Sequence, residues 1–308
     1  MPTQPTTQPE RAREILRKVR QLEVRTRHLV DQALAGKYHS VFKGRGMDFD
    51  SVRPYAIGDD IRSIDWNVTA RTGHPFIKRF REERELKIML AIDISNSGDF
   101  GSVGSSKREY AAEIGAIIAF SALKNNDKVG LVLFTDEVEL YIPAKKGRRH
   151  ILRLVREILF FEPRRKGTDF IVPLDFLNSV LHKRAVTFLI SDFCLVGDFP
   201  TALEQLKPKL RASKRRQDLI AVWVNDPRDS ELPNVGLLTL EDAETGEQVE
   251  VNTSDPKVRE TFQQHAADRR EELHQTLVRT GTDVMELSTA KECMPTLMEF
   301  FRRRDRKK

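Results

Sequence analysis

Four short apolar runs alternate with stretches of helical periodicity in the middle of this chain, and this alternation restricts the fold more than any other feature. The runs are residues 87–93, 128–134, 185–192 and 218–224. Helices are expected over residues 110–124, 148–161 and 199–210, and after Asp169. Such alternation predicts an α/β fold with a doubly wound, mostly parallel sheet, helices on both faces and right-handed crossovers.

The flanking segments predict additions to this core. Residues 235–242 and 248–253 read as a small β-hairpin insertion, after which a helix over 256–279 and a strand over 282–288 resume the alternation. Thr289 to Glu292 has the form of a capping box for a last helix. The expected order is a disordered lead at 1–9, an amphipathic N-terminal helix at 10–36, a wrapping β and loop segment at 37–85, an α/β domain at 86–304 with a hairpin insertion at 232–254, and a basic tail at 305–308.

Composition indicates a soluble globular protein, because 39% of the residues are hydrophobic and 32% are charged. The longest nearly apolar stretch, residues 114–123, is shorter than the roughly 20 residues that span a bilayer. The first residues lack the apolar segment of a secretory signal. We therefore expect no transmembrane segment and a cytoplasmic location.

Charge and cysteine content exclude two further classes of site. Part of the net charge of +6 lies in the basic runs 211–216 and 302–308, neither of which contains an aromatic residue, so nucleic-acid binding is not expected. Cys194 and Cys293 are far apart and have no zinc-site spacing, so we expect neither a disulfide framework nor a structural zinc ion.

Acidic and hydroxyl side chains follow the apolar runs at the points where the chain should leave the sheet. Asp93, Ser95 and Ser97 end the first run, Thr168 precedes a helix, and Asp192 ends a later run. In open parallel sheets the carboxyl ends of strands line the ligand crevice, so these loops can converge. The alternative is that the same side chains only cap helices and turns.

The order of these motifs resembles that of von Willebrand factor A domains, whose metal-ion-dependent adhesion site combines Asp-x-Ser-x-Ser, a loop threonine and a strand-terminal aspartate. The flanking sequence is similar to a narrower bacterial family, domain of unknown function 58. The matching positions are Phe42 to Gly46, Phe49, Val52, Arg53, Tyr55, Gly58 to Trp66, Ala70, Arg71, Glu83, Arg84, Asp226, Pro227 and Glu244 to Gly246. The resemblance implies a partnership with MoxR-type AAA+ ATPases.

The resemblance also implies a set of metal ligands. Ser95, Ser97 and Thr168 would bind the ion directly, and Asp93 and Asp192 would bind it directly or through water. Mg²⁺ prefers such oxygen ligands, with Mn²⁺ and Ca²⁺ as alternatives. Neutral hydroxyls leave much of the charge of the ion uncompensated, so an Asp or Glu of a partner protein can complete its coordination.

One feature departs from related sites, because Gly98 and Asp99 stand where those sites often have methionine and a non-acidic residue. We expect the additional acid to change affinity or ion choice.

The segment from Gly58 to Arg71 allows two interpretations. Asp59, Asp60, Arg62, Asp65 and Arg71 form either a docking surface or an ion-pair and turn network, and we favour the structural network.

The function that follows is a non-enzymatic, metal-dependent protein-binding module, a partner or adaptor of a MoxR-type AAA+ ATPase in protein assembly, maturation or stress response. The seven histidines are scattered, and neither HExxH nor GxSxG is present, so we expect no enzyme. The alternatives are a metal-dependent hydrolase, or a scaffold that binds through its N-terminal helix and leaves the metal site unused.

Overall fold

The computed structural model describes residues 8–33, 47–82, 85–195, 197–241 and 248–306. Most of the predicted disordered lead at 1–9 lies outside these residues, and so does the predicted helix end at Gly36. The chain divides into a main unit, Met1–Val41 with Lys87–Lys308, and a small unit, Phe42–Leu86. That the small unit wraps the main one stays a prediction.

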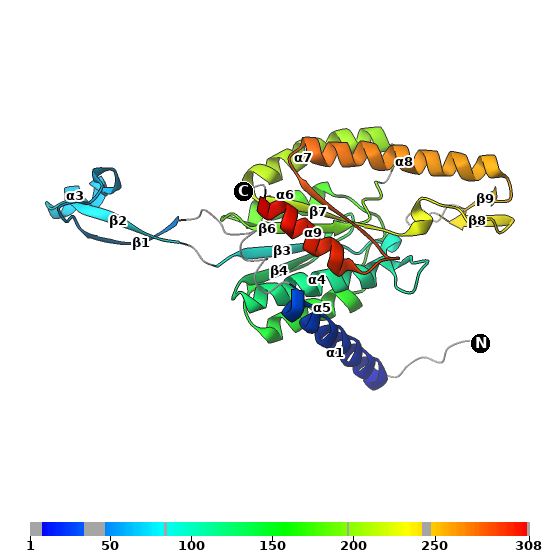
Figure 1. Ribbon diagram of the computed structural model, residues 1–308, viewed down its shortest axis with the longest axis horizontal. Helices are drawn as coiled ribbons and strands as arrows, with labels where there is room; N and C mark the ends of the chain where they lie inside the picture. The colour runs from blue at the N-terminus through cyan, green and yellow to red at the C-terminus, as the bar shows by residue number, and fades with distance from the viewer. Residues whose placement is uncertain (1–7, 34–46, 83–84, 196, 242–247, 307–308) are drawn as a thin grey trace. The chain divides into compact units, whose positions relative to one another are not determined.

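Six strands form the central sheet of the main unit, in the order β10-β7-β6-β3-β4-β5 (Figure 1). They are β3 (Lys87–Asp93), β4 (Lys128–Phe134), β5 (Val138–Lys145), β6 (Val186–Ser191), β7 (Asp218–Asn225) and β10 (Asp283–Ser288). Every neighbouring pair is parallel except β4 and β5. The predicted doubly wound, mostly parallel sheet is therefore confirmed, and β3 lies at its centre.

Strand β5 was not predicted from the sequence. It alternates Val138, Leu140 and Ile142 with more polar residues, as in a half-buried antiparallel strand, and it contains Pro143. A proline has no N–H for a ladder, which sequence reasoning takes as evidence against a central strand. The edge position of β5 removes this objection, because an edge strand needs hydrogen bonds on one side only.

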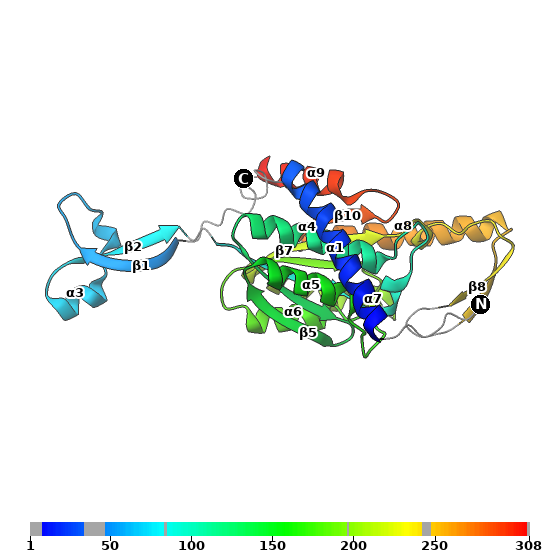
Figure 2. The same ribbon diagram turned by 90° about the horizontal axis from the view of Figure 1, so that it is seen from below.

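Two layers of helices cover the sheet (Figures 1 and 2). One layer consists of α4 (Lys107–Lys124), α5 (Arg148–Phe160) and α9 (Cys293–Arg306), and the other of α6 (Ile171–Val180), α7 (Phe199–Arg216) and α8 (Pro256–Arg279). Along β3, Met89 and Ala91 pack in the α6–α8 layer, whereas Leu90 and Ile92 approach Gly115 of α4. These strand residues are fully buried, each large apolar side chain stabilising the fold by about 1.5–3 kcal/mol.

Helix α1 (Gln8–Ala33) packs outside α4 and α5 (Figure 2). Val19 and Val30 on its apolar stripe are buried. Buried Glu23 accepts a hydrogen bond from Arg148 of α5 at 2.6 Å. These two positions of the apolar stripe are thus already covered by the main unit.

The connection from β7 to β10 contains a short 3-10 helix (Pro227–Asp229) and the antiparallel pair β8 (Leu237–Glu241) and β9 (Gln248–Asn252). The predicted capping box at Thr289 is wrong, because α9 begins only at Cys293. The Thr289 hydroxyl instead donates to Asp226 at 2.7 Å. Among the described residues, no helix combines the length and apolarity needed to cross a membrane.

The small unit pairs β1 (Met47–Pro54) with β2 (Phe76–Glu82) in an antiparallel ribbon. A 3-10 helix (Ile61–Ser63) and α3 (Trp66–Thr72) lie between the two strands in the sequence. Gly73 ends α3 with a φ of 74°, a left-handed conformation that glycine adopts without steric cost.

Candidate metal-binding site

Asp93 lies at the carboxyl end of the central strand β3 and is almost fully buried. One carboxylate oxygen accepts the backbone N–H of Ser95 at 2.9 Å, and the other accepts the hydroxyl of Ser191 at 2.7 Å. Ser191 is the last residue of the neighbouring strand β6. The parallel register of β3 and β6 therefore holds the Asp93 carboxylate at the sheet edge.

Ser95 and Ser97 bring two hydroxyls together directly after β3. Ser95 precedes a 3-10 helix (Asn96–Asp99), and this turn places the two Oγ atoms 3.0 Å apart. Ser95 is only 1% exposed. The Asp-x-Ser-x-Ser spacing thus produces one carboxylate and a pair of hydroxyls within a single turn of chain.

Thr168 lies in the loop between α5 and α6, and backbone hydrogen bonds attach this loop both to the serine turn and to the residue that follows β4. The N–H of Asn96 donates to the carbonyl of Lys166 at 3.2 Å, and the N–H of Asp169 donates to the carbonyl of Thr135 at 3.1 Å. Thr168 itself is buried. The structure therefore brings the predicted threonine loop next to the serine loop.

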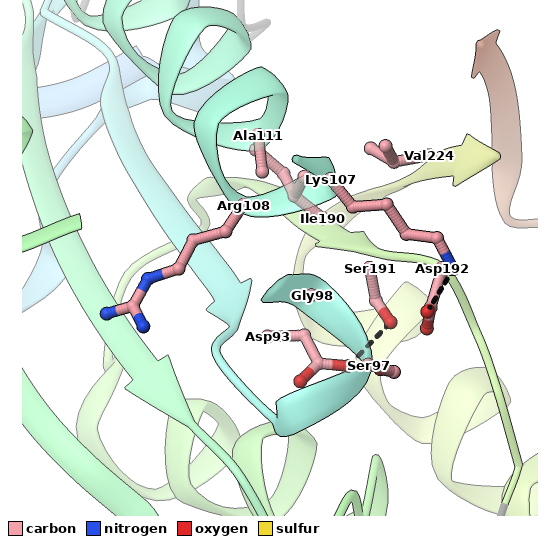
Figure 3. Close-up of a pocket in the computed structure, with 10 residues that line it drawn as sticks. All are labelled: Asp93, Ser97, Gly98, Lys107, Arg108, Ala111, Ile190, Ser191, Asp192 and Val224. Carbon is pink, nitrogen blue, oxygen red and sulfur yellow. Dashed lines mark hydrogen bonds and ion pairs between the residues drawn. The ribbon is translucent and has the colours of Figure 1, made fainter. Parts of the chain in front are cut away.

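Asp192 follows β6, and its carboxylate is bound by a lysine that the sequence analysis did not include. The ammonium of Lys107 lies 2.9 Å from Oδ2 of Asp192 and 2.8 Å from Oδ1 of Asp229 (Figure 3 shows its reach to Asp192). Oδ1 of Asp192 accepts the N–H of Cys194 at 3.1 Å. Each oxygen of this candidate ligand thus has a partner within the protein.

The electrostatics of the site favour a cation. Burial, and then repulsion from Asp192, raise the pKa of Asp93 to about 7, although hydrogen bonds from Ser95 and Ser191 act in the opposite direction. Burial also raises the pKa of Asp229, against the attraction of Lys107. The charged form of Asp93 is therefore disfavoured here, and a cation bound beside it would stabilise that form.

Several of these side chains line a small open pocket, together with Arg108 and the first turn of α4 (Figure 3). The lining residues are Asp93, Ser97, Gly98, Lys107, Arg108, Ala111, Ile190, Ser191, Asp192 and Val224. In the described part of the chain, no group of three or more His, Cys, Asp or Glu side chains could hold a metal ion. The donor set is instead rich in hydroxyls, which are hard oxygen ligands and fit Mg²⁺.

The two unusual positions after the motif take different places. Gly98 lines the pocket, whereas the side chain of Asp99 is 66% exposed and lies 3.7 Å from Arg108. Arg108 is anchored by the backbone carbonyls of Ile158 and Phe161. The additional acid is therefore not one of the residues that line the pocket.

A stack of aromatic rings connects the threonine loop to the aspartate loop. Phe170 and Phe193 are stacked with centroids 5.2 Å apart, and Trp223 meets Phe193 edge-on at 6.0 Å. Phe193 has a φ of 54°, which is uncommon for a residue with a side chain and persists only where the surroundings impose it. This buried cluster holds the backbone directly after Asp192.

The candidate docking residues of the small unit have mainly local structural roles. Asp59 pairs with Arg53 through two hydrogen bonds of 2.8 and 2.7 Å. Asp60 accepts from the backbone of the 3-10 helix, and Asp65 accepts from the first turn of α3. The side chains of Arg62 and Arg71 are exposed. A docking role for this segment stays a prediction.

Sequence reasoning missed Lys107, Ser191 and Asp229 as members of the site. A weak signal existed for Lys107, since a cation in the first turn of a helix opposes the helix dipole and is stabilised by a nearby acid. Ser106 caps this helix, because its hydroxyl accepts the N–H of Glu109 at 3.2 Å. Nothing local indicated that Lys107 contacts residues more than 80 positions away.

Solved structures with similar folds are distant in sequence. An aerotolerance-related membrane protein from Bacteroides fragilis is 15% identical, with a TM-score of 0.46 over 72% of this chain and 100% of that chain. Protein BatB from Bacteroides thetaiotaomicron is 14% identical, with a TM-score of 0.42 over 72% and 99%. The SpRpn10 VWA domain is 13% identical, with a TM-score of 0.38 over 70% and 94%.

Sequence relatives are much closer. Uncharacterized proteins of Mycobacterium tuberculosis and Mycobacterium bovis are each 32% identical to this chain over 290 residues, which are 94% of this chain and 89% of theirs. The model of the family described as protein of unknown function DUF58 matches residues 51–272. The chain therefore belongs to the DUF58 family, as the resemblance of its sequence indicated.

Proposed function

We propose that this chain is a non-enzymatic protein-binding module whose binding depends on a metal ion. The observation that carries the proposal is the convergence of a buried carboxylate, Asp93, with the paired hydroxyls of Ser95 and Ser97 at the carboxyl edge of the sheet. A doubly wound sheet presents its ligand crevice at this edge.

Ser95, Ser97 and Thr168 would hold the ion through hydroxyl oxygens, with Asp93 and Asp192 supplying negative charge. When bound, Mg²⁺ supplies a coordination position for a carboxylate oxygen of an Asp or Glu on the partner. Mn²⁺ and Ca²⁺ are the alternative ions. The hydroxyls contribute no charge, so an acidic partner is favoured over a neutral one.

We propose a MoxR-type AAA+ ATPase, or a client protein of that ATPase, as the partner, in protein assembly, maturation or stress response in the cytoplasm. The sequence resemblance supports this choice of partner. It is the most specific part of the proposal and depends on a direct binding experiment.

The two alternatives have less support. No histidine or cysteine is among the residues that line the pocket, so the lining contains no Ser–His or Cys–His pair. A scaffold that binds through α1 would need its apolar stripe, but Val19 and Val30 are buried against the domain.

The test is capture of the purified MoxR-type ATPase of the same organism by the full chain, in Mg²⁺ and in EDTA. We expect capture in Mg²⁺ only, and loss of capture by Ser95→Ala/Ser97→Ala. The control Ser179→Ala/Ser254→Ala removes two exposed hydroxyls outside the site and should behave as wild type. Capture that persists unchanged in EDTA would contradict metal dependence. Hydrolysis of a phosphoester or peptide by an ATPase-free sample, lost with Asp192→Ala, would show an enzyme instead.

A further inference from the structure

Lys107 places a permanent positive charge inside the proposed metal site. Its side chain is only 8% exposed, and its ammonium lies within 2.9 Å of both Asp192 and Asp229. The ring of Phe100 lies 5.7 Å from the same nitrogen. The lysine comes from the first turn of α4, the helix that follows the Asp-x-Ser-x-Ser turn.

This placement is costly unless it is compensated. Burial disfavours a charged lysine, and the amino end of a helix adds a further repulsion. The attraction of Asp192 and Asp229 outweighs the burial and raises the pKa of Lys107 above its ordinary value. The ammonium is therefore a fixed cation held by two carboxylates rather than a mobile surface charge.

The consequence for a metal ion follows from the charges that face the pocket. One oxygen of Asp192 is bound by the ammonium and the other by a backbone N–H. Within the described part of the chain, Asp99 and Arg108 form an ion pair with each other and not with Asp93 or Asp192. Asp93 is then the only carboxylate among the proposed ligands that no cation of the described residues neutralises.

We infer that Lys107 keeps the metal affinity of the isolated protein low, so that the ion and an acidic group of the partner bind cooperatively. This inference rests on the proposed function. The ammonium repels a divalent cation and competes with it for Asp192, whereas the carboxylate of the partner is attracted by both. Coupling between the two ligands is reciprocal, so the partner strengthens metal binding as much as the metal strengthens partner binding.

Two variants separate the charge of Lys107 from the stability of the fold. Lys107→Met removes the ammonium but leaves the buried carboxylate of Asp192 and the partly exposed one of Asp229 without their cation. Lys107→Met/Asp229→Asn keeps the summed charge of these three residues and releases Asp192 alone, so it should fold more readily. Lys257→Met is the matched control, because Lys257 lies in the first turn of α8 and is exposed.

The experiment titrates Mn²⁺ into each full-length protein at pH 7.5 without a partner and measures the dissociation constant by calorimetry. A parallel thermal melt compares the melting temperature in about 10 mM Mg²⁺ with that in EDTA. We expect both Lys107 variants to bind Mn²⁺ more tightly than wild type by on the order of tenfold or more. Mg²⁺ should raise their melting temperatures by more than that of wild type, and Lys257→Met should match wild type.

The outcomes distinguish the inference from the function on which it rests. If the folded double variant binds Mn²⁺ no more tightly than wild type, the role of Lys107 is refuted while a metal site remains. Weaker binding by the double variant would refute it as well, since Lys107 would then support the site. If neither wild type nor any variant binds Mn²⁺ or Mg²⁺, the proposed function itself fails.

Discussion

Replacing Asp226 with alanine should lower the free energy of unfolding by about 3–4 kcal/mol. Asp226 is 2% exposed and lies directly after β7, at the same sheet edge as the proposed site. Its carboxylate accepts four hydrogen bonds, from the N–H and hydroxyl of Ser102, the hydroxyl of Thr289 and the N–H of Arg228. One side chain thus ties together the loop before α4 and the ends of β7 and β10.

The magnitude follows from these contacts. A hydrogen bond contributes about 1 kcal/mol net, and more when one partner is charged. Four bonds that share one carboxylate are not additive, and water can enter beside Ser102, so about 3–4 kcal/mol is expected rather than a larger sum. Asp226→Asn retains an acceptor oxygen but turns an amide toward a donor, so it should lose about half as much.

The assay is urea unfolding followed by circular dichroism, in EDTA at pH 7. Asp255→Ala is the control, because Asp255 caps the exposed start of α8 through one N–H and should cost at most about 1 kcal/mol. Burial raises the pKa of Asp226, but hydrogen bonds from Ser102, Arg228 and Thr289 outweigh it and lower the pKa. The stability that this carboxylate contributes to the fold is therefore present above its ordinary pKa. It is lost as the pH falls through the lowered pKa.

The difference between wild type and Asp226→Ala should accordingly shrink as the pH falls below about 4, the ordinary pKa of an aspartate. A loss below about 1 kcal/mol at pH 7, or a difference that grows on acidification, would refute this account of the four contacts.

Three further predictions concern the main unit. Gly130→Ala should lower the free energy of unfolding in urea by about 1–3 kcal/mol. A Cβ at this position would lie 2.7 Å from Sδ of Met89 and 2.9 Å from a backbone nitrogen of β5. An unchanged unfolding midpoint would contradict this close packing. Asp218→Asn should destabilise at pH 7 but little at pH 2, since burial raises the pKa of Asp218 while Arg304 outweighs it and lowers the pKa; equal losses at both pH values would be inconsistent with that pair. Val30→Ala should cost about 1–2 kcal/mol if α1 is part of the folded domain, and no measurable loss would mean that the helix detaches readily.

Much of the fold could be predicted because its signals are local. The apolar runs that became β3, β4, β6 and β7 are buried on both faces, so they lack polar alternation and are recognisable without the structure. Helix α8 begins and ends where its periodicity and the flanking Pro256 and Gly281 indicated. Strand β5 was missed because its identity depends on lying at an edge, which no local pattern reports.

The site likewise has a part that local sequence predicted and a part that depends on the tertiary structure. Asp93, Ser95 and Ser97 lie within five residues, and a strand that ends in a tight turn necessarily brings their polar atoms together, so the sequence by itself determined this half. Only the tertiary structure decided that Ser191 bonds to Asp93, and that Lys107 stands between Asp192 and Asp229. These contacts depend on strand register and on the direction in which α4 leaves the turn, which are set by packing across the whole sheet. The charge of the site, and with it the affinity for an ion, is therefore a property of the assembled fold.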